Sequence, residues 1–175
     1  CPLTQTNGIT FEDLFDPAAI QRLQDAFASA TGVASIITHP NGTPITAPSN
    51  FTHLCSKIIR QTEQGCFNCY QSDAAIGRYN PSGPIVQQCL SGGLWDAGAS
   101  ITVGGRHLAN WLIGQVRDET QNEESMRAYA HAIGADEAAF MKAFHEVPSM
   151  SQERFGYVAQ ALFILANQLS SAAYQ

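Results

Sequence analysis

A pair of glycines between two strand-like runs is the clearest structural signal in this 175-residue sequence. Residues 97–103 and 106–116 are rich in strand-forming residues, and the Gly104-Gly105 pair between them is typical of a tight hairpin turn. The sequence therefore predicts an antiparallel sheet that contains this hairpin. A regular two-residue turn sorts the side chains into two faces, with Ile101, Val103, Leu108 and Leu112 on one and Ser100, Thr102, His107, Trp111 and Gln115 on the other.

Further helices and strands are expected on both sides of the hairpin. A helix is predicted over 16–31, because Asp16 can cap its first turn, Pro17 is tolerated at a helix start and Gly32 can end it. The other predicted elements are strands at 33–38, 43–46 and 85–90 and helices at 51–64 (ended by Gly65), 72–79, 121–133 and 136–144.

A long helix is predicted from about residue 150 to 175. Its apolar residues step by three and four positions, which is coiled-coil spacing: Phe155, Val158, Leu162, Leu165 and Leu169. Two interpretations of this stripe remain open. The helix either packs on the domain core, or forms a dimer and carries a ligand-induced shift into a downstream output module.

The order of elements has no repeating strand–helix alternation, so we expect an α+β domain around an antiparallel sheet. The length fits a single domain spanning residues 1–175. The net charge of −6 and the scattered basic residues argue against direct nucleic-acid binding. The sequence has no apolar run long enough for a membrane span, and its start, Cys1-Pro2-Leu3, does not resemble a secretion signal.

Four of the five cysteines lie within 35 positions: Cys55, Cys66, Cys69 and Cys89. A chain with a sizeable core has no need of disulfides, which favours a reducing, cytoplasmic location. Three roles remain open for the thiols. They can line the core or a pocket, hold a metal ion or iron–sulfur cluster, or form a redox switch around the C-x-x-C pair. Zinc-ribbon and ferredoxin spacings are not matched.

A second group of candidate residues lies on the polar face of the hairpin. Tryptophans combine a large apolar surface with one N–H donor. Together with a histidine, a carboxylate and an amide they can line a small pocket: Trp95, Asp96, His107, Trp111 and Gln115. Alternatively, this face packs on a helix and tolerates polar residues at its edge. No nucleophile elbow, phosphate loop or dinucleotide fingerprint occurs, so an enzyme is not expected.

The cysteines and glycines also stand in a familiar order. The run Cys55-Ser56-Lys57-Ile58-Ile59-Arg60 is followed by Gly65, Cys69, Cys89, Gly93-Leu94, Ile101 and Gly114-Gln115-Val116. This order resembles the PocR-type sensory domain. The resemblance extends from about Phe11 to Leu169. It implies a PAS-like fold with a five-stranded antiparallel sheet, flanking helices and a ligand cavity between them.

The resemblance also implies a function. Such domains serve as input modules upstream of histidine kinases or DNA-binding domains, and they sense small organic molecules such as a short alcohol, diol or hydrocarbon derivative. The family's recurring cysteines would correspond to Cys55, Cys69 and Cys89. Many members carry a histidine directly after the last of these, where this chain has Leu90 and a loop one residue longer. That departure puts in doubt any ligand chemistry that depends on the histidine.

Together these patterns predict a ligand-binding site made of Cys55, Cys69, Cys89, Trp95, His107, Trp111 and Gln115. The alternative is a metal, iron–sulfur or thiol redox sensor that uses Cys55, Cys66, Cys69 and Cys89. In the first case the partners are a small organic ligand, an output module in the same chain and a second copy of the chain.

Overall fold

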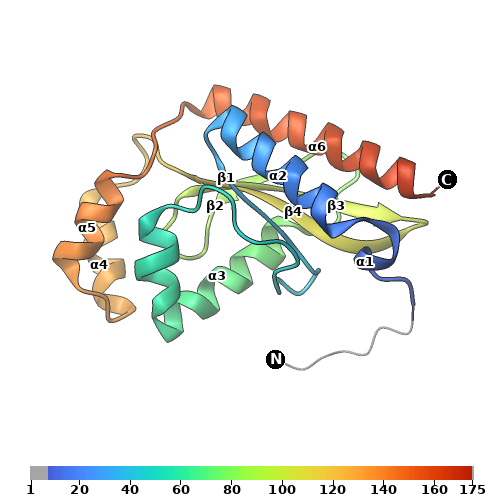
Figure 1. Cartoon of the computed structure of the whole chain (residues 1–175). Coiled ribbons are helices and arrows are strands. Elements are labelled where there is room, and N and C mark those ends of the chain that lie inside the picture. The colour runs from blue at the N-terminus through green and yellow to red at the C-terminus, as the bar shows by residue number, and fades with distance from the viewer. Residues whose placement is uncertain (1–7, 175) are drawn as a thin grey trace.

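The predicted hairpin forms the middle of an antiparallel sheet. The computed structural model describes residues 8–174, and its strands are β1 (Ala34–Thr38), β2 (Ile85–Gln88), β3 (Trp95–Val103) and β4 (Arg106–Val116). They lie in the order β1-β4-β3-β2, and each neighbouring pair is antiparallel (Figure 1). The mixed helix-and-sheet fold is therefore as expected.

The fifth strand implied by the family resemblance is absent from residues 8–174. The segment 43–46, predicted to return beside β1, makes only an isolated bridge between Thr38 and Pro44. One reason is that Pro44 has no N–H to donate to a ladder. A second is that the Ile37 N–H donates to the Thr46 side-chain oxygen at 2.9 Å instead of to a backbone carbonyl.

The irregular segment after β1 is held by a buried glutamine instead of by the hydrogen bonds of a strand ladder. Gln24 is 0 % exposed, and its Nε2 donates to the Ala47 carbonyl at 2.8 Å and to the Ser49 hydroxyl at 2.7 Å. Its Oε1 accepts from the Thr46 hydroxyl. Buried polar groups need such partners, so one side chain both satisfies itself and satisfies backbone that a strand would have paired.

Six α-helices and a short irregular segment surround the sheet in the described part of the chain. The irregular segment consists of the π-helical turn η1 (Leu54–Ile58) and the 3₁₀ turn η2 (Ile59–Gln61). The helices are α1 (Phe11–Leu14), α2 (Pro17–Thr31), α3 (Glu63–Ile76), α4 (Glu123–Ala132), α5 (Glu137–His145) and α6 (Gln152–Tyr174). Helix α2 has the predicted caps, since Asp16 accepts from the Ala18 N–H and Gly32 has a φ of 82°. No described helix is long and apolar enough to cross a membrane.

The prediction that Gly65 ends a helix is wrong. Thr62 caps α3 by accepting a hydrogen bond from the Gly65 N–H at 3.0 Å, so Gly65 lies in the first turn. The glycine is needed for close approach, because a Cβ there would overlap the carbonyl oxygen of Ile59. This carbonyl ends η2 by accepting from the Thr62 N–H and hydroxyl.

A β-bulge changes the predicted faces of the hairpin. Thr102 pairs with His107 but Ile101 pairs with Ala109, which leaves Leu108 as an extra residue. A bulge of one residue reverses the inside–outside alternation beyond it. Trp111 and Leu112 therefore lie on faces opposite to those that a regular turn predicts.

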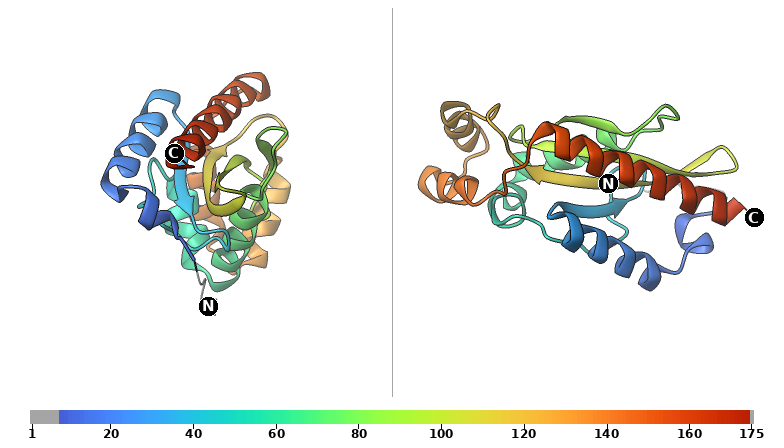
Figure 2. Two further views of the ribbon diagram at one scale, coloured as in Figure 1. Left: turned by 90° about the vertical axis from the view of Figure 1, so that its right-hand side faces the viewer. Right: turned by 90° about the horizontal axis from the view of Figure 1, so that it is seen from above.

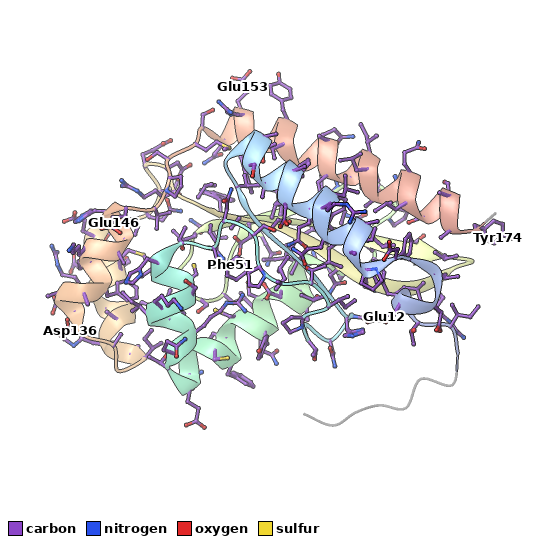
Figure 3. All side chains as sticks on the ribbon, in the orientation of Figure 1. Glu12, Phe51, Asp136, Glu146, Glu153 and Tyr174 are labelled. Atoms are coloured by element: carbon purple, nitrogen blue, oxygen red, sulfur yellow. The ribbon has the colours of Figure 1, made fainter. Side chains whose placement is uncertain are left out.

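The two faces of the sheet are covered differently. Helices α2 and α6 lie on one face, while α3 and the η segment lie on the other, and α4 and α5 sit at one end (Figures 1 and 2). The face under α2 and α6 is filled by a large apolar cluster that includes Phe27, Ile101, Trp111 and Leu162. Charged residues such as Glu12 and Asp136 lie at the periphery, whereas the partly buried Phe51 lies near the middle of this view (Figure 3).

The stripe on the last helix packs on the sheet. Phe155, Val158 and Leu162 are buried in the large cluster, and Leu165 and Leu169 pack against it. Tyr157 and Ile164 are exposed on the opposite side of α6. Core packing therefore accounts for the spacing, and a role of this helix in dimerisation stays a prediction.

We predict that Gly65→Ala destabilises the fold by about 1–3 kcal/mol, because the added methyl group collides with fixed backbone. Chemical denaturation measures the change. The matched control is Gly156→Ala in α6, where a Cβ meets nothing within 4 Å. There the better helix propensity of alanine should stabilise by about 0.5–1 kcal/mol. Equal stability of Gly65→Ala and the parent chain would contradict the proposed overlap.

Candidate ligand-binding site

A cavity lies between the less densely covered face of the sheet and α3. Its volume is about 40 Å³, and one buried water needs roughly 10–15 Å³ on this scale. The cavity thus accommodates a molecule of a few heavy atoms. Apolar side chains form much of its wall: Ala34, Ile36, Phe51, Ile76, Leu94 and Leu112.

Four of the seven predicted ligand-binding residues line this cavity. Cys55 comes from η1, Cys69 from α3, Cys89 from the loop after β2, and Gln115 from β4. Residues as far apart in sequence as Cys55 and Gln115 meet here because β4 passes beside the segment that carries the first two thiols. The cavity lies between the sheet and the segment that follows residue 55, on the sheet face opposite to Trp111.

The other three predicted residues lie outside the lining. Trp111 is 0 % exposed on the opposite face, where its Nε1 donates to the Ser35 hydroxyl at 2.9 Å. His107 lies near the hairpin turn, with Nε2 2.6 Å from the Asn110 side-chain oxygen. Trp95 belongs to the cluster under α6, and its Nε1 donates to Asp118 at 3.0 Å.

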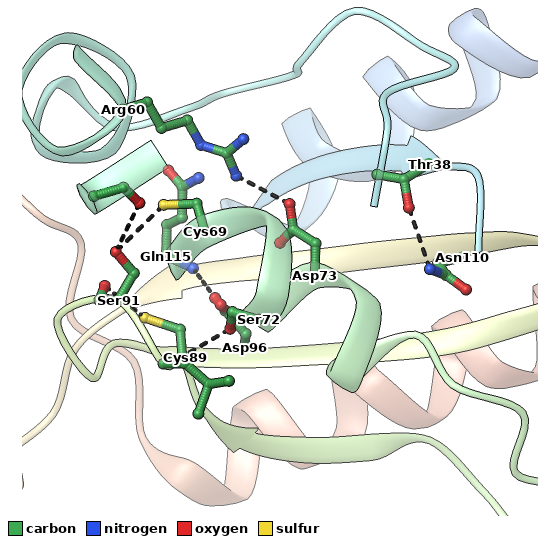
Figure 4. Close-up of polar contacts among 12 residues, drawn as sticks. Thr38, Arg60, Cys69, Ser72, Asp73, Cys89, Ser91, Asp96, Asn110 and Gln115 are labelled. Carbon is green, nitrogen blue, oxygen red and sulfur yellow. Dashed lines mark hydrogen bonds and ion pairs between the residues drawn. The ribbon is translucent and has the colours of Figure 1, made fainter. Parts of the chain in front are cut away.

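The cavity thiols are poor nucleophiles. Burial raises the pKa of Cys55 to about 12 and also raises the pKa values of Cys69 and Cys89. The Cys89 thiol donates to the Ser91 carbonyl at 2.9 Å, and the Cys69 thiol donates to the Ser91 hydroxyl at 3.4 Å (Figure 4). Protonated thiols of this kind behave as small, weakly polar wall groups.

The fourth cysteine of the predicted metal set is placed differently. Cys66 lies on α3 outside the cavity lining. Within residues 8–174, no three His, Cys, Asp or Glu side chains are arranged to hold a metal ion. A metal ion or iron–sulfur cluster on the four cysteines stays a prediction from their spacing.

A buried ion pair in the cavity wall was not predicted. Arg60 of η2 donates through Nη2 to Asp73 of α3 at 3.1 Å, and the two side chains are 17 % and 12 % exposed (Figure 4). The guanidinium also stacks over Phe51, with 5.0 Å between its central carbon and the ring centroid. The sequence feature that could have indicated a buried charge is an arginine directly after two apolar residues, in Ile58-Ile59-Arg60.

Asp96 occupies the point where the central ladder is interrupted. Trp95 pairs with Val116 but Asp96 pairs with Gly114, so Gln115 bulges out with a φ of 60°. The Gln115 N–H, which has lost its ladder position, donates to Asp96 Oδ1 at 2.9 Å (Figure 4). A side chain at Gly114 would overlap the Asp96 carboxylate. The bulge therefore depends on this pair of residues.

The environment of Asp96 makes its carboxyl group unusually weak as an acid. Burial raises its pKa to about 7, the nearby Asp73 adds to the effect, and the Gln115 N–H and the Arg60 charge only partly oppose it. Near neutral pH the wall thus holds a balanced ion pair, three protonated thiols and a carboxyl group that is partly protonated. A perturbed acid on a cavity wall is a feature of functional sites.

The chain also matches a known protein family over most of its length. A family model described as "Sensory domain found in PocR" matches residues 13–174. The chain belongs to the PocR sensory-domain family. The expected resemblance is thereby confirmed over nearly the whole chain.

A curated relative of this PocR domain is a regulatory protein. The chain is 31 % identical over 100 residues to the Regulatory protein PocR of Salmonella typhimurium, an alignment that covers 56 % of this chain and 32 % of the relative. The match thus spans about a third of the relative's length. No solved structure matches the chain.

We predict that Asp96→Asn stabilises the ligand-free domain at pH 8 by about 1–3 kcal/mol. The folded-state pKa of about 7 lies above the ordinary aspartic-acid value of 3.8, so the folded domain loses stability as pH rises from about 4 to 7. An amide avoids this loss and still accepts from Gln115. Denaturation at pH 8 and pH 4 should show a gain that vanishes at the lower pH. Asp136→Asn, which keeps the cap of α5, should change little at either pH.

Proposed function

We propose that this PocR domain is the sensory input domain of a signal-transduction protein and binds a short alcohol, a diol or a similar small hydrocarbon derivative in the cavity. The cavity beside α3 is the observation that carries the proposal. Ligand sites are typically concave and apolar with a few convergent polar groups. Apolar side chains and thiols suit the carbon skeleton of such a ligand, and Asp96 and Gln115 suit its hydroxyl groups.

The output is proposed to lie in the same polypeptide. The relative's name, Regulatory protein PocR, and the third of its length that is matched support a module joined to further domains. We propose a downstream histidine kinase or DNA-binding module, and a homodimer as the signalling unit. A location in the cytoplasm fits the free thiols of the four described cysteines.

Strand β4 offers a route from the cavity to the last helix. Two residues beyond Gln115, the Arg117 N–H donates to the Pro148 carbonyl at 3.0 Å and the Arg117 carbonyl accepts from the Met150 N–H at 3.0 Å. The Arg117 side chain donates to the Val147 carbonyl at 2.9 Å. A ligand that moves Asp96 or Gln115 would therefore act, through a short stretch of backbone, on the segment that leads into α6.

Thermal denaturation with a panel of short alcohols, diols, acids and amines tests the proposal. A compound that binds only the folded state must raise Tm in a concentration-dependent way. The variant Ala34→Leu, which extends a wall side chain into the cavity, should abolish the shift. Ala161→Leu on the exposed side of α6 is the matched control and should retain it. A panel with no active compound, on protein freed of retained ligand, would refute the proposal.

The route is tested separately with the compound that raises Tm most. Ligand binding should change hydrogen exchange in the first turn of α6 in the parent domain. Arg117→Ala removes the side-chain bonds to the α5–α6 connection without touching the cavity, so it should leave Kd within about twofold and suppress the exchange response. Arg154→Ala, an exposed change on α6, should leave both unchanged. An unaltered response in Arg117→Ala would exclude this route.

A further inference from the structure

The cavity wall holds two carboxyl groups, those of Asp73 and Asp96, and one guanidinium group, that of Arg60. The pairing of these groups determines which ligand charge the cavity accepts. Arg60 is the cation in the wall, and its charge is already paired with the Asp73 carboxylate. No Lys, Arg or His side chain within residues 8–174 forms an ion pair with Asp96. A second carboxyl group therefore faces the cavity without a counter-ion.

The two oxygens of Asp96 have different environments. Oδ1 accepts the Gln115 N–H at 2.9 Å, whereas Oδ2 has no hydrogen-bonding partner among the described residues. The burial of the site disfavours the ionised form of this carboxyl group. Protonation removes the charge and turns this oxygen into a hydrogen-bond donor directed by the fixed position of the other.

We infer that Asp96 is the specificity-determining residue of the cavity and that it binds as a neutral carboxylic acid, donating through Oδ2 to a hydroxyl oxygen of an uncharged ligand. This inference rests on the proposed function and narrows it to neutral, hydroxylated ligands. Carboxylates of the same size are rejected, because the cation they need is already paired with Asp73 and their charge would enter the cavity without a counter-ion.

Every charged or titratable group that faces Asp96 fits this role. Asp73 on α3 and the burial of the site favour the protonated form, and Arg60 on η2 opposes it. The facing thiols of Cys55, Cys69 and Cys89 stay protonated at neutral pH, because burial raises their pKa values. Asp96 is thus the wall group whose charge changes near pH 7.

A set of three-carbon compounds matched in size separates the charge classes. Calorimetric titrations use propane-1,3-diol, 3-hydroxypropanoate and 3-aminopropan-1-ol at pH 6 and pH 9. The diol should bind at pH 6 and weaken by roughly tenfold for each pH unit above 7, because the proton that the complex needs must be taken up. The acid and the amine should bind at least tenfold more weakly than the diol at pH 6.

Two variants assign the effect to the residue. Asp96→Asn keeps a neutral donor in the same place, so the diol should bind equally well at both pH values. Asp73→Asn, the matched change on the same wall, releases Arg60 and should allow 3-hydroxypropanoate to bind. If Asp96→Asn does not fold, titrations in two buffers of different ionisation enthalpy at pH 8 still measure proton uptake, which should approach one proton for each diol bound.

The outcomes separate this inference from the proposed function. Equal diol affinity at pH 6 and pH 9, equal binding of the acid, or tightest binding of the amine at pH 9 would overturn the role of neutral Asp96 and leave the cavity as a ligand site. Failure of all three compounds to bind would also overturn this role. If, in addition, no compound of the thermal panel raised Tm, the proposed function itself would be overturned.

Discussion

One hydrogen bond, from the Gln115 N–H to Asp96, determines much of this domain's architecture. The bulge at Gln115 ends the regular β3–β4 ladder and leaves a backbone donor that must find an acceptor inside the protein. Asp96 supplies it, and Gly114 lets the carboxylate approach. The same bulge turns the Gln115 side chain toward η1, where its Oε1 accepts from the Thr52 N–H and hydroxyl. One irregularity thus shapes the sheet, anchors the segment opposite it and places a carboxyl group on the cavity.

The difference in packing between the two sheet faces follows from side-chain size. Large residues such as Trp111 point toward α2 and α6 and fill that face. On the cavity face, Gly98 and Gly114 flank Leu112, and a Cβ at Gly98 would overlap Leu112 and the Ile76 carbonyl. Small residues bring α3 close to the sheet but do not fill the space beside it. The packed face therefore supports α6, while the opposite face retains the cavity.

Local signals predicted the local features of this fold well. The caps of helix α2 are its sequence neighbours Asp16 and Gly32, and the Gly104-Gly105 turn directly joins β3 to β4. Neither feature depends on residues distant in sequence. The bulge at Leu108 and the inclusion of Gly65 in α3 were missed, because both depend on contacts that form only after folding. The site was predicted in part for the same reason. The cysteines were visible as a cluster, whereas Arg60 and Asp73 become a pair only when η2 packs on α3.

The unpaired carboxyl group is the strongest sign that the cavity serves a purpose beyond packing. A buried ion pair such as Arg60–Asp73 adds little net stability, although it satisfies its own charges. The charge of Asp96 has no such partner. Its folded-state pKa of about 7 means that the folded state disfavours ionisation of this carboxyl group. Asparagine would satisfy the Gln115 N–H without that cost. A residue that weakens the fold at neutral pH, on the wall of a cavity, next to the strand that leads to α6, is most simply explained by what it does for a molecule bound there.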